Sequence, residues 1–141
     1  MFSKACEYAI KSMIYIESQG ADSRKIGLSE IAEAIDSPVA FTAKILQQLK
    51  KRGLLISTVG PKGGFQTQKN KPVTIKEIVL AIDGDGFFSK CVLGLKVCSS
   101  SNPCPAHEAY VSIKENTIKG LMDIEIEDFT GKINNKSIAL K

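Results

Sequence analysis

Three cysteines and the only histidine of the chain lie close together in the sequence. Cys91, Cys98, Cys104 and His107 form the pattern C-x6-C-x5-C-x2-H. Thiolates and imidazole are ligands for zinc, iron and iron–sulfur clusters. Structural zinc sites usually take cysteines from pairs separated by about two to four residues, whereas the longer gaps seen here suit a loop that wraps around a larger group. The pattern therefore favours an iron–sulfur cluster, with a thiol redox switch and a zinc site as alternatives.

The composition bounds the class of protein that carries this pattern. The 141 residues are 43% hydrophobic, which is enough to form the core of one globular unit. No stretch reaches the ~18–20 apolar residues needed to cross a bilayer. The N-terminal segment contains Glu7 and Lys11 and has no cleavage site typical of a signal peptide. We therefore expect a cytoplasmic protein with reduced cysteines, and membrane, secreted and fibrous classes are excluded.

Charge is distributed unevenly along the chain. The 19 basic and 15 acidic residues give a formal charge of +4. Between residues 37 and 76 there are eight basic residues and no acidic one, whereas in residues 105–132 the acidic residues outnumber the basic ones. A solvated basic face needs no partner, but a long segment without carboxylates is also what a surface for a polyanion such as nucleic acid requires.

The basic segment carries the pattern of a helix-turn-helix. Apolar spacing predicts a first helix over residues 3–18. Ser29 is expected to cap a second helix over residues 30–35, and a third helix is expected to begin near Pro38 and to end at Gly53. The inner face of the third helix would be Phe41, Ile45, Leu46 and Leu49. Its exposed positions, which are candidates for DNA contact, would be Thr42, Lys44, Gln47, Gln48 and Lys51.

A predicted β-hairpin follows directly. Residues 54–59 are aliphatic and β-branched and predict a strand, and residues 65–68 predict its return. The turn Gly60-Pro61-Lys62-Gly63-Gly64 joins them. These glycines are also compatible with an ordinary hairpin turn, but bare backbone amides at Gly63 and Gly64 beside the charge of Lys62 suit phosphate binding. We therefore predict a winged helix-turn-helix, with Ser29 as a further DNA-binding candidate.

The predicted fold class is mainly α with a small β-hairpin wing, in which a long dimerisation helix follows the DNA-binding unit. Residues 1–83 would form the winged helix-turn-helix domain, which ends in a helix over 73–82. Residues 84–104 would form the cysteine-rich loop, and residues 105–130 the dimerisation helix, whose core extends to about Ile126. The alternative is that this helix folds back on its own domain. Residues 131–141 are expected to form a frayed tail.

The chain resembles the IscR/NsrR/CymR (Rrf-type) family of bacterial winged-helix transcription regulators over nearly its whole length. The resemblance rests on Tyr8-Ala9, on Ile31-Ala32, on the segment from Ile45 to Leu54, on Gly60-Pro61-Lys62-Gly63-Gly64-Phe65, on Ile75-x-x-Ile78 and on the three-cysteine loop. It implies homodimers joined by the last helix. It also implies binding of double-stranded, palindromic operator DNA under the control of a [2Fe–2S] or [4Fe–4S] cluster, of which we favour [2Fe–2S].

The resemblance offers two candidates for the fourth ligand of such a cluster. His107 matches a histidine of the iron–sulfur-biogenesis branch, and Glu7 matches an acidic ligand that the nitric-oxide-sensing branch takes from the other subunit; His107 is preferred. The chain departs from the family in the gap of six residues between Cys91 and Cys98, where five is usual. It also departs at Val59, where many relatives have Arg, and at Pro38, Ala40 and Ala43, where relatives have polar residues.

These observations predict a transcription regulator of the repressor type. Its operator binding would be controlled by an iron–sulfur cluster that senses nitric oxide, redox state or iron–sulfur supply. The alternative is a winged-helix regulator without a cluster that responds to thiol oxidation or to a partner protein. We do not expect an enzyme, because the chain has one histidine, no Walker-type phosphate loop and no nucleophile elbow.

Overall fold

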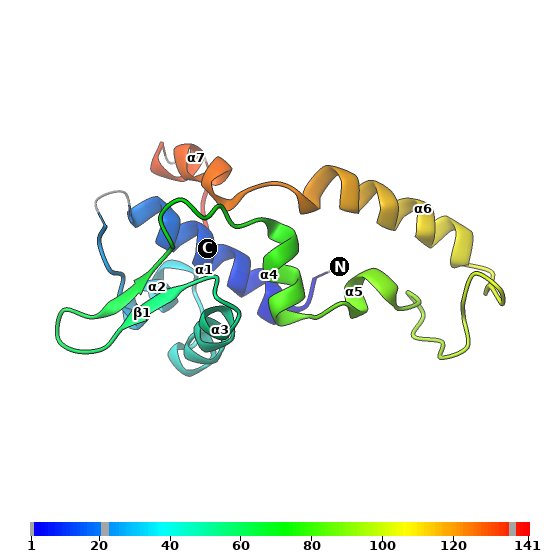
Figure 1. Cartoon of the computed structure of the whole chain (residues 1–141), viewed down its shortest axis with the longest axis horizontal. Coiled ribbons are helices and arrows are strands. Elements are labelled where there is room, and N and C mark those ends of the chain that lie inside the picture. The colour runs from blue at the N-terminus through cyan, green and yellow to red at the C-terminus, as the bar shows by residue number, and fades with distance from the viewer. Residues whose placement is uncertain (1, 21–22, 136–137) are drawn as a thin grey trace.

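The computed structural model of the chain describes residues 2–20, 23–135 and 138–141. The described residues fold mainly into helices, with a two-stranded antiparallel sheet (Figure 1). This is the predicted fold class. The helices are α1 (Lys4–Gln19), α2 (Leu28–Ala34), α3 (Val39–Lys51), α4 (Ile75–Ile82), α5 (Gly86–Ser89), α6 (His107–Thr117) and α7 (Thr130–Asn134), and the strands are β1 (Ile56–Thr58) and β2 (Gly64–Gln66).

Helix α1 is the scaffold of the molecule. Ser3 caps it by accepting a hydrogen bond from the backbone amide of Cys6 (3.0 Å). Ala9, Met13 and Ile16 are fully buried at intervals of four and three residues, so they form one apolar stripe. This helix contacts α2, α3 and α4 as well as the C-terminal α7. The predicted DNA-binding unit and the C-terminal segment therefore share one core.

The predicted cap at Ser29 is wrong. Helix α2 begins at Leu28, after Gly27, and no side chain caps its first turn. Ser29 lies inside this turn and is exposed. The start of α2 is held instead by Glu30, which accepts hydrogen bonds from Arg24 (2.9 and 2.8 Å) and from the Tyr15 hydroxyl of α1 (3.0 Å). These charge-assisted bonds fix α2 against α1.

Helix α3 buries three of the four residues predicted for its inner face, Ile45, Leu46 and Leu49, but Thr42 takes the place of Phe41. Its buried residues are Thr42, Ile45, Leu46 and Leu49, which have the spacing of one continuous helix face. The prediction that Thr42 is exposed is wrong, because it has no exposed surface and its hydroxyl donates to the Pro38 carbonyl or the Ser37 hydroxyl (both 3.0 Å). Phe41 was expected inside, but it is 37% exposed, and its ring meets the Tyr8 ring edge-on. The helix ends as predicted before Gly53, whose φ is +74°.

The wing is a short hairpin in the register Ile56↔Gln66, Ser57↔Phe65 and Thr58↔Gly64. Its strands are shorter than predicted, because Leu54 and Leu55 turn into the core before the pairing begins. Phe65 also exchanges two backbone hydrogen bonds of 2.8 Å with Ile26, which attaches the wing to the loop before α2. A Cβ at Gly64 would lie 2.8 Å from the Ile26 carbonyl oxygen, so this contact requires glycine.

Helix α4 begins two residues later than predicted. Thr74 caps it in a capping box with Glu77, so the helix starts at Ile75 and not at Val73. The preceding residues pair with the C-terminal segment: the Ile75 amide donates to the Ile124 carbonyl (3.0 Å), and the Ile126 amide donates to the Val73 carbonyl (2.9 Å).

The C-terminal helix is shorter than predicted. Helix α6 continues through a π-helical turn, Ile118–Met122, and ends at Asp123, so one helix over 105–130 is wrong. Met122 and Ile126 are both buried in the core. A 3₁₀ turn (Ile126–Phe129), which contacts α1, leads into α7. The prediction of a frayed tail over residues 131–141 is wrong for residues 131–134, because they belong to α7, which packs on α1. Residues 136 and 137 lie outside the described part. No helix among the described residues is long and apolar enough to span a bilayer.

Candidate cysteine site and DNA-binding face

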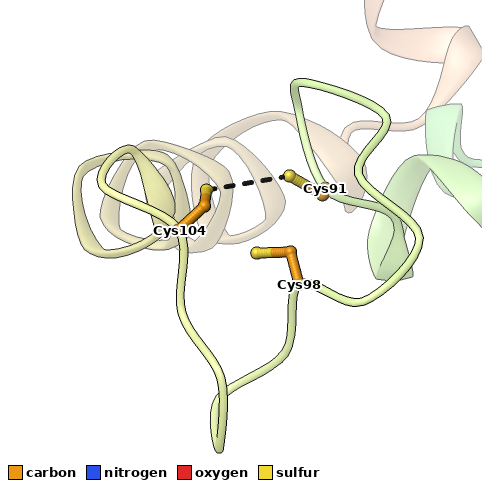
Figure 2. A group of neighbouring side chains, drawn as sticks. All are labelled: Cys91, Cys98 and Cys104. Carbon is orange, nitrogen blue, oxygen red and sulfur yellow. Dashed lines mark hydrogen bonds between the residues drawn. The ribbon is translucent and has the colours of Figure 1, made fainter.

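The three cysteines of the loop after α5 converge on one point (Figure 2). The sulfur atoms of Cys91, Cys98 and Cys104 all lie within 4.8 Å of one another, and those of Cys91 and Cys104 are 3.9 Å apart. All three residues are partly exposed and none forms a disulfide. The arrangement therefore presents three thiols that could ligate metal together and that solvent can reach.

Two turns bring the cysteines together. After Cys91 the chain reverses at Gly94, whose amide donates to the Cys91 carbonyl (2.9 Å) and whose φ is +69°. Between Cys98 and Cys104, Ser99 and Asn102 exchange backbone hydrogen bonds of 3.2 and 3.1 Å. The long gaps between the cysteines are therefore taken up by compact turns.

The structure places His107 beside the cysteines and Glu7 elsewhere. His107 is the first residue of α6, and its Nδ1 lies 3.3 Å from the sulfur of Cys98. Glu7 lies in the first turn of α1 and pairs with Lys4 (3.0 Å), which holds the pKa of its carboxyl below the usual range. Within one chain, His107 is thus the candidate that adjoins the thiols.

The surroundings of the thiols leave space for a bound group. A cavity of about 410 Å³ is bordered by the three cysteines and His107, and by α6 residues such as Tyr110 and Lys114. Since α6 forms one wall of this cavity, a group bound here would touch the helix that leads into the core of the molecule.

The three thiols are not equivalent. Hydrogen bonds with the backbone at Leu93 and Leu95 hold the pKa of the Cys91 thiol below its ordinary value. A backbone hydrogen bond at Cys104 lowers the pKa of the Cys98 thiol, but desolvation and the neighbouring thiols outweigh it, so that pKa is raised. Cys91 is therefore the thiol that deprotonates first of these two.

Cys6 belongs to the core and not to this site. It is fully buried on α1, and burial, together with the nearby Asp83, raises the pKa of its thiol to about 12. A thiol with so high a pKa stays protonated and unreactive in the folded protein.

The candidate DNA-binding residues lie on α3 and the wing, except Ser29, which lies on α2. The exposed residues of the predicted set are Lys44, Gln47, Gln48 and Lys51 on α3, Lys62 on the wing and Ser29 on α2. Thr42 is removed from the set by its burial. The Gly63 amide donates to the Gly60 carbonyl (2.8 Å) and so forms part of the turn itself.

An anchor that the sequence did not reveal ties the wing to α3. The carbonyl of Gly53, just after α3, accepts hydrogen bonds from the Gln68 side chain (2.9 Å) and from the Lys71 ammonium (3.1 Å). Both donors lie in the segment that leaves β2. They satisfy a carbonyl at the helix end, and they fix the angle between α3 and the wing. Lys71 was counted only as part of the basic segment, because a long-range contact to a backbone atom leaves no pattern in the sequence.

Comparison with known proteins gives concordant results. Residues 2–132 match the Rrf2 family model, described as an iron-dependent transcriptional regulator. A protein of Aquifex aeolicus described as an HTH-type transcriptional regulator is 32% identical over 137 residues, covering 89% of this chain and 93% of its own.

Two solved structures share the fold. The global cysteine regulator CymR of B. subtilis superposes with a TM-score of 0.74 at 18% identity, over 93% of this chain and 96% of its own. IscR of T. potens superposes with a TM-score of 0.73 at 18% identity, over 99% of this chain and 92% of its own.

Proposed function

The chain belongs to the Rrf2 family of transcriptional regulators, and we propose that it is a cytoplasmic repressor whose affinity for operator DNA is controlled by an iron–sulfur cluster. The observation that carries the proposal is the convergence of Cys91, Cys98 and Cys104, whose sulfur atoms lie within 4.8 Å of one another. Three thiols that lie this close together and that solvent can reach suit shared ligation of a metal group, or exchange of electrons between them.

The donor set fits an iron–sulfur cluster. Three thiols with an imidazole at the rim are ligands that such clusters accept, and the adjoining cavity is bordered by all four side chains. The three cysteines would hold the group, and His107 is our choice for the fourth ligand because it already contacts Cys98. When bound, the cluster supplies a centre that reacts with oxidants and nitric oxide. Of the two cluster types that the resemblance implies, we choose [2Fe–2S].

We propose that two copies of the chain bind DNA together as a homodimer. The described residues of α6 include no buried side chain, and Ile113 on this helix is 56% exposed. A helix whose apolar residues lack a partner in its own chain suits a homodimer. Two α3 helices would then enter successive major grooves about 34 Å apart on a palindromic operator, with the wings over the flanking minor grooves.

The path of α6 supports control of DNA binding by the site. The wing and the cysteine loop lie at opposite ends of the molecule (Figure 1). Helix α6 begins at His107 and leads through its π-helical turn, which contacts α4, to Met122, which is buried in the core. A change in the loop can therefore shift α6 and alter the distance between the two α3 helices of a dimer. An operator with fixed half-site spacing would respond to a small shift.

The test combines spectroscopy with DNA titration. Protein purified without oxygen should be coloured and should contain iron and sulfide. Holo, nitrosylated and apo protein should then be titrated against one operator at one salt concentration. We expect their affinities to differ by about tenfold or more, which needs only about 1.4 kcal/mol of differential stabilisation. Three coincident binding curves would refute control by the cluster.

A second candidate is a thiol switch without a cluster. Its support is the closeness of Cys91 and Cys104, whose sulfurs are 3.9 Å apart, together with the likeness in fold to the cysteine regulator CymR. A peroxide would accept two electrons and two protons as these thiols form a disulfide. In that case the anaerobic protein would be colourless and free of sulfide, and peroxide alone would change its affinity for DNA. If the protein responds instead to a partner protein, neither loss of a cluster nor peroxide should change its affinity for DNA.

A further inference from the structure

The exposed start of α3 is apolar. Val39 is 47% exposed, Ala40 is exposed, and Ala43 is partly exposed. The one polar residue among them, Thr42, points inward, and its hydroxyl is hydrogen-bonded to Pro38 and Ser37. The first outward side chain able to form a hydrogen bond is therefore Lys44. We refer to Val39, Ala40 and Ala43 as the α3 apolar patch.

The α3 apolar patch belongs to the face of α3 that points away from the core. Ala40, Lys44, Gln47 and Lys51 follow one another at intervals of four, three and four residues, so they lie on one side of the helix. The buried side chains Thr42, Ile45, Leu46 and Leu49 occupy the opposite side. Val39 and Ala43, four residues apart, lie together on one side of Ala40. The patch and the basic residues thus form one continuous surface.

The surroundings of the patch are positively charged. No carboxylate occurs between residues 37 and 76. Lys44 and Lys51 share the patch's face, and Lys11 lies over the Tyr8 ring (5.9 Å), against which Phe41 packs. An apolar patch within a basic surface suits a polyanion that also offers apolar groups. Duplex DNA meets this description, since its major groove is lined by phosphates and carries the methyl group of thymine.

We propose that the α3 apolar patch selects operators by contact with thymine methyl groups in the major groove, an inference that rests on the proposed function. The thymine methyl is the only apolar group that the base edges present there. Alanine and valine side chains can contact this methyl, but they cannot replace the water that hydrogen-bonds to the edges of the other bases. Operator half-sites should therefore contain T·A pairs at the positions that face Val39 and Ala40.

The test uses deoxyuridine, which lacks only the methyl group of thymidine. Operators are first selected from a pool of random duplexes with the wild-type protein. Each thymine of the selected half-site is then replaced in turn by deoxyuridine. We expect about a fourfold loss of affinity for each methyl group that is contacted, and no change for thymines outside the half-sites.

Variants assign the effect to the patch. Val39→Ser and Ala40→Ser change exposed side chains and should leave the fold intact, which circular dichroism checks. They should bind thymine and deoxyuridine operators equally. The matched control is Val59→Ser, because Val59 is 95% exposed on the wing and lies outside α3; it should retain the full difference between the two operators.

The outcomes separate this inference from the proposed function. If the wild-type protein selects an operator but binds its thymine and deoxyuridine forms equally, the inference is overturned and the proposed function stands. Selected half-sites without T·A pairs, or α3 variants that still discriminate fully, overturn it too. A protein that binds no duplex at all overturns both.

Discussion

At the scale of single residues, the cysteine site depends on four side chains that contribute nothing to the hydrophobic core. Cys91, Cys98 and Cys104 are each expected to be required for iron incorporation. A variant with all three replaced by serine should contain no iron or sulfide, yet it should melt within a few degrees of the apo protein, because the core lies elsewhere. Metal analysis and thermal denaturation check this. An unfolded variant would indicate a structural zinc site instead.

His107 and Glu7 provide a matched pair for the fourth ligand. Because His107 contacts Cys98, His107→Ala should speed loss of the cluster by on the order of tenfold. Glu7→Ala removes only an exposed ion pair with Lys4 and should leave the cluster unchanged. The measurement is the decay of the visible absorption in the presence of a chelator. The opposite result would show that the ligand comes from the partner subunit.

At the scale of elements, the wing is predicted to place a positive charge against the DNA backbone. Lys62 is exposed at its tip. Lys62→Ala should weaken binding to all sequences and reduce the slope of log affinity against log salt by roughly one, because one phosphate contact is lost. Lys132→Ala, on α7, is the control and should leave the slope unchanged. An unchanged slope for Lys62→Ala would contradict the role of the wing.

The wing also depends on a glycine for its shape. A Cβ at Gly63 would overlap the carbonyl oxygen of Thr58, which is backbone and cannot move aside cheaply. Gly63→Ala should therefore distort the turn and lower affinity for operator by about tenfold or more, while the helical core stays folded. Gly131→Ala on α7 meets open space and should bind normally. Fluorescence anisotropy with labelled operator measures both, and normal binding by Gly63→Ala would show that the wing adapts.

At the scale of the whole molecule, α6 is the surface that we propose for contact with a second copy. Ile113→Asp places a charge on this exposed apolar position, so the proposed dimer should dissociate. Sedimentation should then show monomers, and operator affinity should fall by about tenfold or more because the two half-sites are no longer bound together. Ile138→Asp, also an exposed isoleucine, should remain dimeric. Unaltered sedimentation of Ile113→Asp would place the dimer interface elsewhere.

Much of this organisation could be predicted from local signals. The amphipathic spacing of α1, the glycine that ends α3 and the Gly-Pro-Lys-Gly-Gly turn act over a few residues, so they indicated the winged helix-turn-helix correctly. The spacing of the cysteines predicted a loop that wraps around a bound group. In the structure, turns at Gly94 and at Asn102 bend the chain within this short segment and bring the three sulfur atoms together.

Other features were decided only by contacts between distant segments. Thr42 is buried because its hydroxyl is satisfied within the first turn of α3, so a residue that counts as polar in a sequence pattern can face the core. The C-terminal helix stops at Asp123 because Ile124 and Ile126 pair with the backbone before α4, and Met122 and Ile126 enter the core. Helical spacing continues past this point in the sequence. A backbone pairing between residues fifty positions apart leaves no trace in local spacing, and only the tertiary structure reveals it.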